Sequence, residues 1–112
     1  MAFIDACAIE ELPAGAAHRL TAGPEPVAIF NVDGDLLAID DTCTHGDFSL
    51  AQGFLEGDRI ICCLHMATFS LRTGEVLAPP ASRPVRVYPV RVMNGRIQVD
   101  VAAGRYHPEA RP

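Results

Sequence analysis

The chain has 112 residues and a mass of 12.0 kDa, which is enough for one small domain with a modest core. Hydrophobic residues make up 49% and charged residues 21%, so the composition is that of a globular protein and excludes a disordered one. The net charge of −5 argues against a nucleic-acid-binding protein, which would carry a basic face.

The N-terminal residues, MAFIDACAIEELPAG, are acidic and do not have the pattern of a signal peptide. No stretch approaches the ~18 consecutive apolar residues of a membrane span, so we expect no membrane association and a cytoplasmic protein. In a reducing compartment, cysteines are more often metal ligands or core residues than disulfides. The four cysteines are Cys7, Cys43, Cys62 and Cys63, and the strand-like surroundings of Cys7 predict a small core residue there.

The first clear local prediction is a β-hairpin. Asp33-Gly34 separates the apolar runs 27–32 and 36–39, and an Asp-Gly pair between apolar runs is typical of a tight hairpin turn. Shorter strand-like pieces follow at 59–61, 68–71 and 76–77, separated by turn residues. No helical periodicity extends beyond about two turns.

The second clear prediction is a hairpin at Asn94-Gly95, the strongest short hairpin pattern in the chain. Ile97 and its neighbours at every second position alternate with polar residues, as in a strand with one buried face. The nine glycines and nine prolines also favour short strands and turns over long helices.

These patterns predict an all-β fold in a single domain over 1–112. We expect a base of antiparallel strands from about 1–40 and 83–102, with a turn-rich segment at about 41–82 inserted between them. Residues 103–112 have no strong pattern and are expected to form a C-terminal tail.

Four residues of the inserted segment carry the chemistry. Cys43 and His45 form a C-x-H motif, and after 16 intervening residues Cys62 and His65 form a C-x-x-H motif. Two thiolates and two imidazoles suit zinc or an iron–sulfur centre. Zinc fingers usually pair cysteine with cysteine and histidine with histidine along the chain, whereas here each half supplies one of each. A binuclear site, with both cysteines on one metal and both histidines on the other, would use this arrangement.

The run CTHGDFSLAQGFLEGDRIICCLHMATFSLRTGEVL resembles the cluster-binding segment of Rieske-type ferredoxins, most closely those that serve bacterial aromatic-ring-hydroxylating dioxygenases. The resemblance implies a Rieske fold, with an antiparallel β-sandwich or barrel as the base and a small inserted cluster-binding subdomain. It implies one [2Fe–2S] cluster per chain, with Cys43 and Cys62 on one iron. His45 and His65 would bind the other iron through Nδ1.

Departures from the respiratory Rieske proteins bear on the reduction potential. Those proteins add a disulfide where this chain has Phe48 and Leu64, and hydroxyl groups where it has Ala67 and Phe69. Without hydroxyls that donate to the sulfurs, the reduced cluster is less stabilised, so we expect a potential near the low end of the Rieske range, roughly −150 mV. We expect four apolar side chains to cover the cluster and exclude water: Phe48, Leu64, Met66 and Phe69.

By the same resemblance, the function is one-electron transfer from a flavin-dependent NAD(P)H reductase to a terminal Rieske non-heme iron oxygenase that hydroxylates aromatic compounds. The chain itself would be an electron carrier and not an enzyme, and we expect a monomer.

Two alternatives to an electron-carrier ferredoxin remain open from the residues. The chain could be a small Rieske subunit of another redox enzyme, such as a nitrite reductase, or a zinc-binding interaction module. Within the motif, Cys63 would be an inert spacer, an alternative ligand to Cys62, or an oxidation-sensitive thiol, because Cys63 and His65 also form a C-x-H pair.

Overall fold

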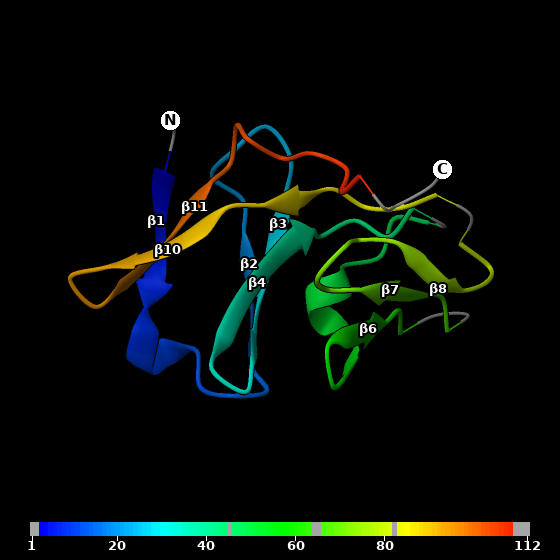
Figure 1. Ribbon diagram of the computed structural model, residues 1–112, viewed down its shortest axis with the longest axis horizontal. Coiled ribbons are helices and arrows are strands. Elements are labelled where there is room, and N and C mark those ends of the chain that lie inside the picture. The colour runs from blue at the N-terminus through cyan, green and yellow to red at the C-terminus, as the bar shows by residue number, and fades with distance from the viewer. Residues whose placement is uncertain (1–2, 45, 64–65, 82, 109–112) are drawn as a thin grey trace.

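The computed structural model describes residues 3–44, 46–63, 66–81 and 83–108. The molecule measures 39 × 26 × 23 Å along its principal axes, and three antiparallel sheets follow one another along the longest of them (Figure 1). The described residues contain no α-helix, only the short 3-10 segments η1 (Ile9–Glu11) and η2 (Leu50–Gln52). Neither helix is long or apolar enough to cross a membrane.

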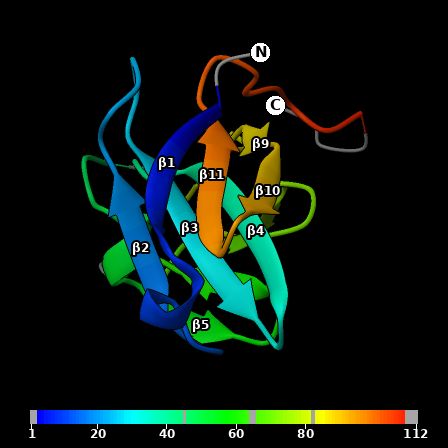
Figure 2. The ribbon, with the colours of Figure 1, turned by 90° about the vertical axis from the view of Figure 1, so that its left-hand side faces the viewer.

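The first sheet joins the two ends of the chain. Its central strand lies between an N-terminal strand and its own hairpin partner, as Figure 2 shows from the side of the base. The strands, in spatial order, are β1 (Phe3–Ala8), β11 (Arg96–Asp100) and β10 (Val90–Met93).

The second sheet forms the middle layer. It contains the Asp33-Gly34 hairpin, flanked by one strand on each side. Its strands, in spatial order, are β2 (Ala17–Leu20), β3 (Val27–Val32), β4 (Asp35–Asp40) and β9 (Val87–Tyr88).

The third sheet is a meander made entirely from residues 54–78. Each of its strands pairs with the next along the chain, so the sheet is local in sequence. Its strands are β5 (Phe54–Glu56), β6 (Arg59–Ile61), β7 (Thr68–Ser70) and β8 (Val76–Ala78).

The apolar run of β3 is buried on both faces, because this strand separates two cores. Val27 and Ile29 pack toward the first sheet, whereas Ala28, Phe30 and Val32 pack toward the third. Successive side chains of a strand point to opposite faces, so one continuous apolar run serves both cores. The middle sheet thereby connects the first and third sheets through buried side chains.

Both predicted hairpins are confirmed, and their turn residues have the expected backbone. Asp33 and Gly34 have φ of 51° and 98°, and Asn94 and Gly95 have φ of 52° and 75°. Two successive positive φ angles are the requirement of the type I′ turn, whose twist matches that of the flanking strands. The all-β fold class and the predicted short strands near 59–61, 68–71 and 76–77 are confirmed as well.

Part of the expected C-terminal tail lies against β9. Arg105 forms a β-bridge with Val87, with N–H to C=O distances of 2.9 and 3.1 Å. Gly104 lies so close to the ring of Tyr88 that a β-carbon there would collide with it. Residues 104–105 of the expected C-terminal tail are therefore held against β9 by backbone pairing and close packing.

Candidate metal centre

The first of two similar loops, residues 43–48, begins three residues after β4. Cys43 starts it, with only 2% of its surface exposed. The Cys43 N–H donates to the carbonyl of Phe48 at 2.9 Å, which closes the loop. Within it, the Gly46 N–H donates to the carbonyl of Cys43 at 3.2 Å, so the chain folds back on the cysteine.

The second loop, residues 62–67, connects β6 to β7. Cys62 directly follows β6 and is fully buried. Its N–H donates to the carbonyl of Ala67 at 2.7 Å. In each loop, therefore, a buried cysteine closes the loop by donating to the carbonyl five residues further along the chain. The two halves of the motif, which look alike in sequence, are alike in backbone hydrogen bonding too.

Both cysteines belong to one buried cluster, which also includes residues of the base and of the third sheet. A thiolate is a strong metal ligand, and its electrostatic attraction to a metal ion is stronger in an apolar environment that excludes water. Two buried cysteine sulfurs from two loops match the cysteine side of a [2Fe–2S] centre. The largest apolar members of this cluster are Phe30, Ile39, Leu50, Ile60, Phe69 and Leu71.

His45 and His65, the other two predicted ligands, lie outside the residues that the structure describes, as does Leu64. Within 3–44, 46–63, 66–81 and 83–108, no three histidine, cysteine or carboxylate side chains gather as a metal site. Since only two of the predicted ligands fall in these ranges, the four-residue ligand set stays a prediction.

Other contacts hold the two loops to the rest of the chain. The Thr44 hydroxyl donates to the carbonyl of Arg83 at 2.7 Å, which attaches the first loop to the segment returning to the base. Gly53 lies against the carbonyl of Ile61, immediately before Cys62, and a β-carbon at position 53 would overlap that oxygen. The approach of these two backbones places the end of η2 beside the start of the second loop.

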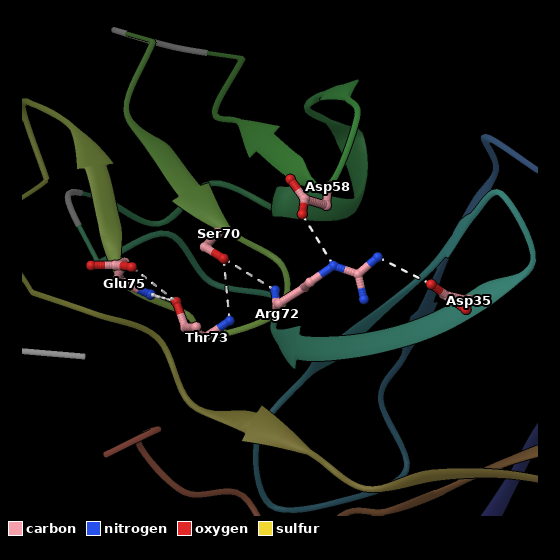
Figure 3. A network of polar contacts seen from close by, with 6 residues as sticks. All are labelled: Asp35, Asp58, Ser70, Arg72, Thr73 and Glu75. Carbon is pink, nitrogen blue, oxygen red and sulfur yellow. Dashed lines mark hydrogen bonds and ion pairs between the residues drawn. The ribbon is translucent and has the colours of Figure 1, made fainter. Parts of the chain in front are cut away.

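An arginine fastens the opposite end of the β6–β7 hairpin. The Arg72 guanidinium donates to Asp58 at 3.1 Å and to Asp35 of β4 at 3.0 Å (Figure 3). The Ser70 hydroxyl accepts from the N–H groups of Arg72 and Thr73, both at 3.2 Å, and so shapes the turn that presents the arginine. The hydrogen bond with Asp35, followed by that with Asp58, raises the pKa of Arg72. Arg72 thus connects the third sheet to the middle sheet.

The neighbours of the predicted ligands have unequal exposure. Cys63 is exposed whereas Cys62 is buried, which favours Cys62 as the sulfur ligand. Met66 is 57% exposed and has a φ of 64°, so its side chain lies outside the buried core, and its covering of the cluster stays a prediction. Phe69 is fully buried, and Cys7 is the predicted core residue, whose thiol pKa is raised by burial.

One residue of this region was missed by the sequence reasoning. Asp41 is 1% exposed and lies two positions before Cys43. A carboxylate at the end of an apolar strand reads as a solvated loop residue from the sequence alone. Its burial follows from the chain segments that pack around it.

Comparison with known proteins gives a consistent result. A family model described as the Rieske [2Fe-2S] domain matches residues 2–89. The chain is 44% identical over 108 residues to the biphenyl dioxygenase ferredoxin subunit of Pseudomonas sp. strain KKS102, covering 96% of this chain and 99% of that protein. It is 43% identical over 110 residues to the 3-phenylpropionate/cinnamic acid dioxygenase ferredoxin subunit of Escherichia coli K12, covering 97% of each.

Among solved structures, the fold is similar to the ferredoxin in a complex of reduced oxygenase and oxidized ferredoxin in carbazole 1,9a-dioxygenase. The TM-score is 0.83 at 34% identity, and the match covers 88% of this chain and 92% of the other.

Proposed function

Since the chain belongs to the Rieske [2Fe–2S] domain family, we propose that it is the ferredoxin component of an aromatic-ring dioxygenase system. Its role is to carry one electron at a time to a terminal oxygenase. The Rieske [2Fe–2S] cluster of the family supplies the redox chemistry by cycling between an oxidised state and a state reduced by one electron. The relatives matched over nearly their whole length are named ferredoxin subunits, which supports a carrier and not the oxygenase itself.

The single observation that carries the proposal is the pair of buried cysteines at equivalent positions of two similar loops. We assign Cys43 and Cys62 to one iron. His45 and His65 complete the proposed ligand set on the other iron, in keeping with the motif spacing and with the donor set of a Rieske centre. The apolar residues around the cysteines exclude water from the sulfur side of the site.

The proposed electron donor is a flavin-dependent NAD(P)H reductase, and the proposed acceptor is a Rieske non-heme iron oxygenase acting on an aromatic compound. Support for the acceptor comes from the similar ferredoxin solved in complex with its oxygenase. A monomer in the cytoplasm suits a carrier that must meet two partners in turn. The net charge of −5 suits docking on partners with basic patches.

The experiment has two stages. The purified protein is analysed for iron and acid-labile sulfide, and the reduced form is examined by electron paramagnetic resonance. We expect two iron and two sulfide per chain and the low average g value of a Rieske centre. A colourless protein with one zinc per chain would refute the proposal.

In the second stage, the protein replaces the native ferredoxin of a biphenyl-type dioxygenase system. NADH-dependent product formation, dependent on this protein, is the expected result. Because the chain contains no lysine, carbodiimide can cross-link its carboxylates only to amines of the partner, apart from its own N-terminus. Cross-links to both reductase and oxygenase support the shuttle. The shuttle is refuted if the reductase does not reduce the oxidised protein and the oxygenase does not oxidise the reduced protein.

A further inference from the structure

The two loops are similar in their closing hydrogen bonds but differ in what holds their ends. The second loop is the tip of a regular hairpin, and three residue pairs of β6 and β7 lead up to it, ending at Ile61–Thr68. Among the described residues, the first loop has only one isolated bridge, between Thr42 and Ser49. A sheet ladder therefore fixes the ends of the second loop, and something else must fix those of the first.

At the ends of the first loop, hydrogen bonds to the carboxylate of Asp41 supplement this single bridge. Its Oδ1 accepts from the Ser49 hydroxyl at 2.7 Å and from the Ala51 N–H at 3.0 Å. The backbone carbonyl of Asp41 also accepts from the Leu50 N–H at 2.6 Å. Asp41, two positions before the first loop, thus binds the three residues that follow the loop, so both ends of the loop are held together.

A second set of contacts attaches this junction to the base. Oδ2 of Asp41 accepts from Nε of Arg19 on β2 at 2.7 Å. The Asp41 N–H donates to the carbonyl of Pro26, just before β3, at 3.0 Å. Asp41 is 1% exposed, whereas the Arg19 side chain is 48% exposed, so the arginine supplies the compensating charge from the surface. A buried carboxylate without these partners would be strongly destabilising.

We propose that Asp41 is the positioning residue for the first cluster-binding loop, holding the backbone of Cys43 in place through Ser49, Ala51 and Arg19. The proposal rests on the proposed function, since it takes Cys43 as a cluster ligand. Asp41 is not one of the four proposed cluster ligands. It acts by replacing the missing ladder, so that the first loop keeps the geometry that the second loop has from its hairpin.

The chain offers a matched control in the preceding residue. Asp40 points to the other side of the strand, where it accepts from the Tyr88 hydroxyl at 2.6 Å and from Arg86 at three donors between 2.8 and 3.1 Å. Asp40 is therefore also a well-bonded carboxylate next to the same loop, yet its partners lie on β9 and the segment before it. Loss of Asp40 weakens the fold without releasing Ser49 or Ala51.

The test compares Asp41→Asn with Asp40→Asn in the holoprotein. Asparagine keeps one acceptor oxygen but places an amide where Arg19 requires a carboxylate. The rate of cluster release to an iron chelator is measured at denaturant concentrations that give both variants the same folded fraction. Because hydrogen bonds to a charged group are strong, we expect release about ten- to a hundredfold faster in Asp41→Asn, and a change below about threefold in Asp40→Asn.

Hydrogen exchange gives a local readout that a general loss of stability would not produce. Amides of residues 43–51 are expected to exchange faster in Asp41→Asn, while the Cys62 amide stays protected. Equal release rates at equal folded fraction, or equal exchange in both loops, would overturn the proposal.

If Asp41→Asn does not fold, Ser49→Ala and Arg19→Gln remove single partners of the carboxylate and give the same comparison, and unchanged release in both would overturn it. A wild-type protein that binds no [2Fe–2S] cluster would instead refute the proposed function. If the wild-type protein binds the cluster but Asp40→Asn and Asp41→Asn do not differ in cluster release or hydrogen exchange, this inference alone is refuted.

Discussion

Replacing each of the adjacent cysteines with serine tests the ligand assignment most directly. Cys62 is fully buried at the start of the second loop, whereas Cys63 is exposed. Serine is nearly the same size as cysteine but is a poor ligand for iron. The Cys62 N–H bond to Ala67 uses the backbone alone, so the loop closure is available in both variants. Any difference between them therefore reports on the side chain.

The expected magnitudes differ strongly between the two positions. In Cys62→Ser, a hydroxyl replaces a thiol inside an apolar cluster, which costs about 1–3 kcal/mol if the hydroxyl finds no partner. Loss of the metal removes its contribution to folding in addition. In Cys63→Ser, the change is at an exposed position and should alter the unfolding free energy by less than about 0.5 kcal/mol.

The assay combines iron and sulfide content, visible absorbance and urea unfolding followed by circular dichroism. We expect Cys63→Ser to keep two iron per chain and the absorbance of the wild type, and Cys62→Ser to lose both. The reverse outcome would assign the ligand to Cys63 and refute the argument from burial. Retention of the cluster in both variants would remove Cys62 and Cys63 alike from the required ligand set.

Three further predictions follow from other parts of the structure. Ala67→Ser, at a fully buried position of the second loop, should raise the midpoint potential by on the order of 60 mV, because a new hydrogen bond to sulfur worth about 1.4 kcal/mol stabilises the reduced state. An unchanged or lower potential in a spectroelectrochemical titration would contradict this prediction. Arg72→Gln removes the exposed ion pairs with Asp35 and Asp58, so urea unfolding should show a small destabilisation at low ionic strength that disappears in 1 M salt. A destabilisation that does not depend on salt would contradict this prediction. Burial and, second, the hydrogen bond to a carboxylate raise the pKa of Tyr88, so its contribution to stability is fully present below the ordinary tyrosine pKa of about 10 and declines above it. Tyr88→Phe should flatten this decline in the unfolding free energy, and identical pH profiles for variant and wild type would refute the reasoning.

Local chemistry decided the parts of this protein that the sequence predicts correctly. The Asp33-Gly34 and Asn94-Gly95 turns could be located because their backbone angles are available to few residue pairs. The cysteine positions could be located because C-x-H and C-x-x-H are short patterns whose chemistry depends on residue type. The resemblance to Rieske-type ferredoxins, carried by the same motifs, extended this to the fold, and the comparisons confirm it.

Strands without alternation or turn residues were harder to find. The short strands β2, β5 and β9 have no clear pattern of their own, and they are strands because a neighbour offers them hydrogen bonds. The bridge between Val87 and Arg105 is of the same kind, since backbone pairing leaves no mark in the side chains.

The sequence by itself determined the turns, the alternation of buried residues and the order of the candidate ligands, because each depends on residues close together in the chain. Only the tertiary structure decided that β3 separates two cores and that Asp41 is buried between segments at Arg19 and Ser49. Burial of a charged residue depends on partners 22 and 8 positions away in the chain, and no local pattern specifies where those partners will lie.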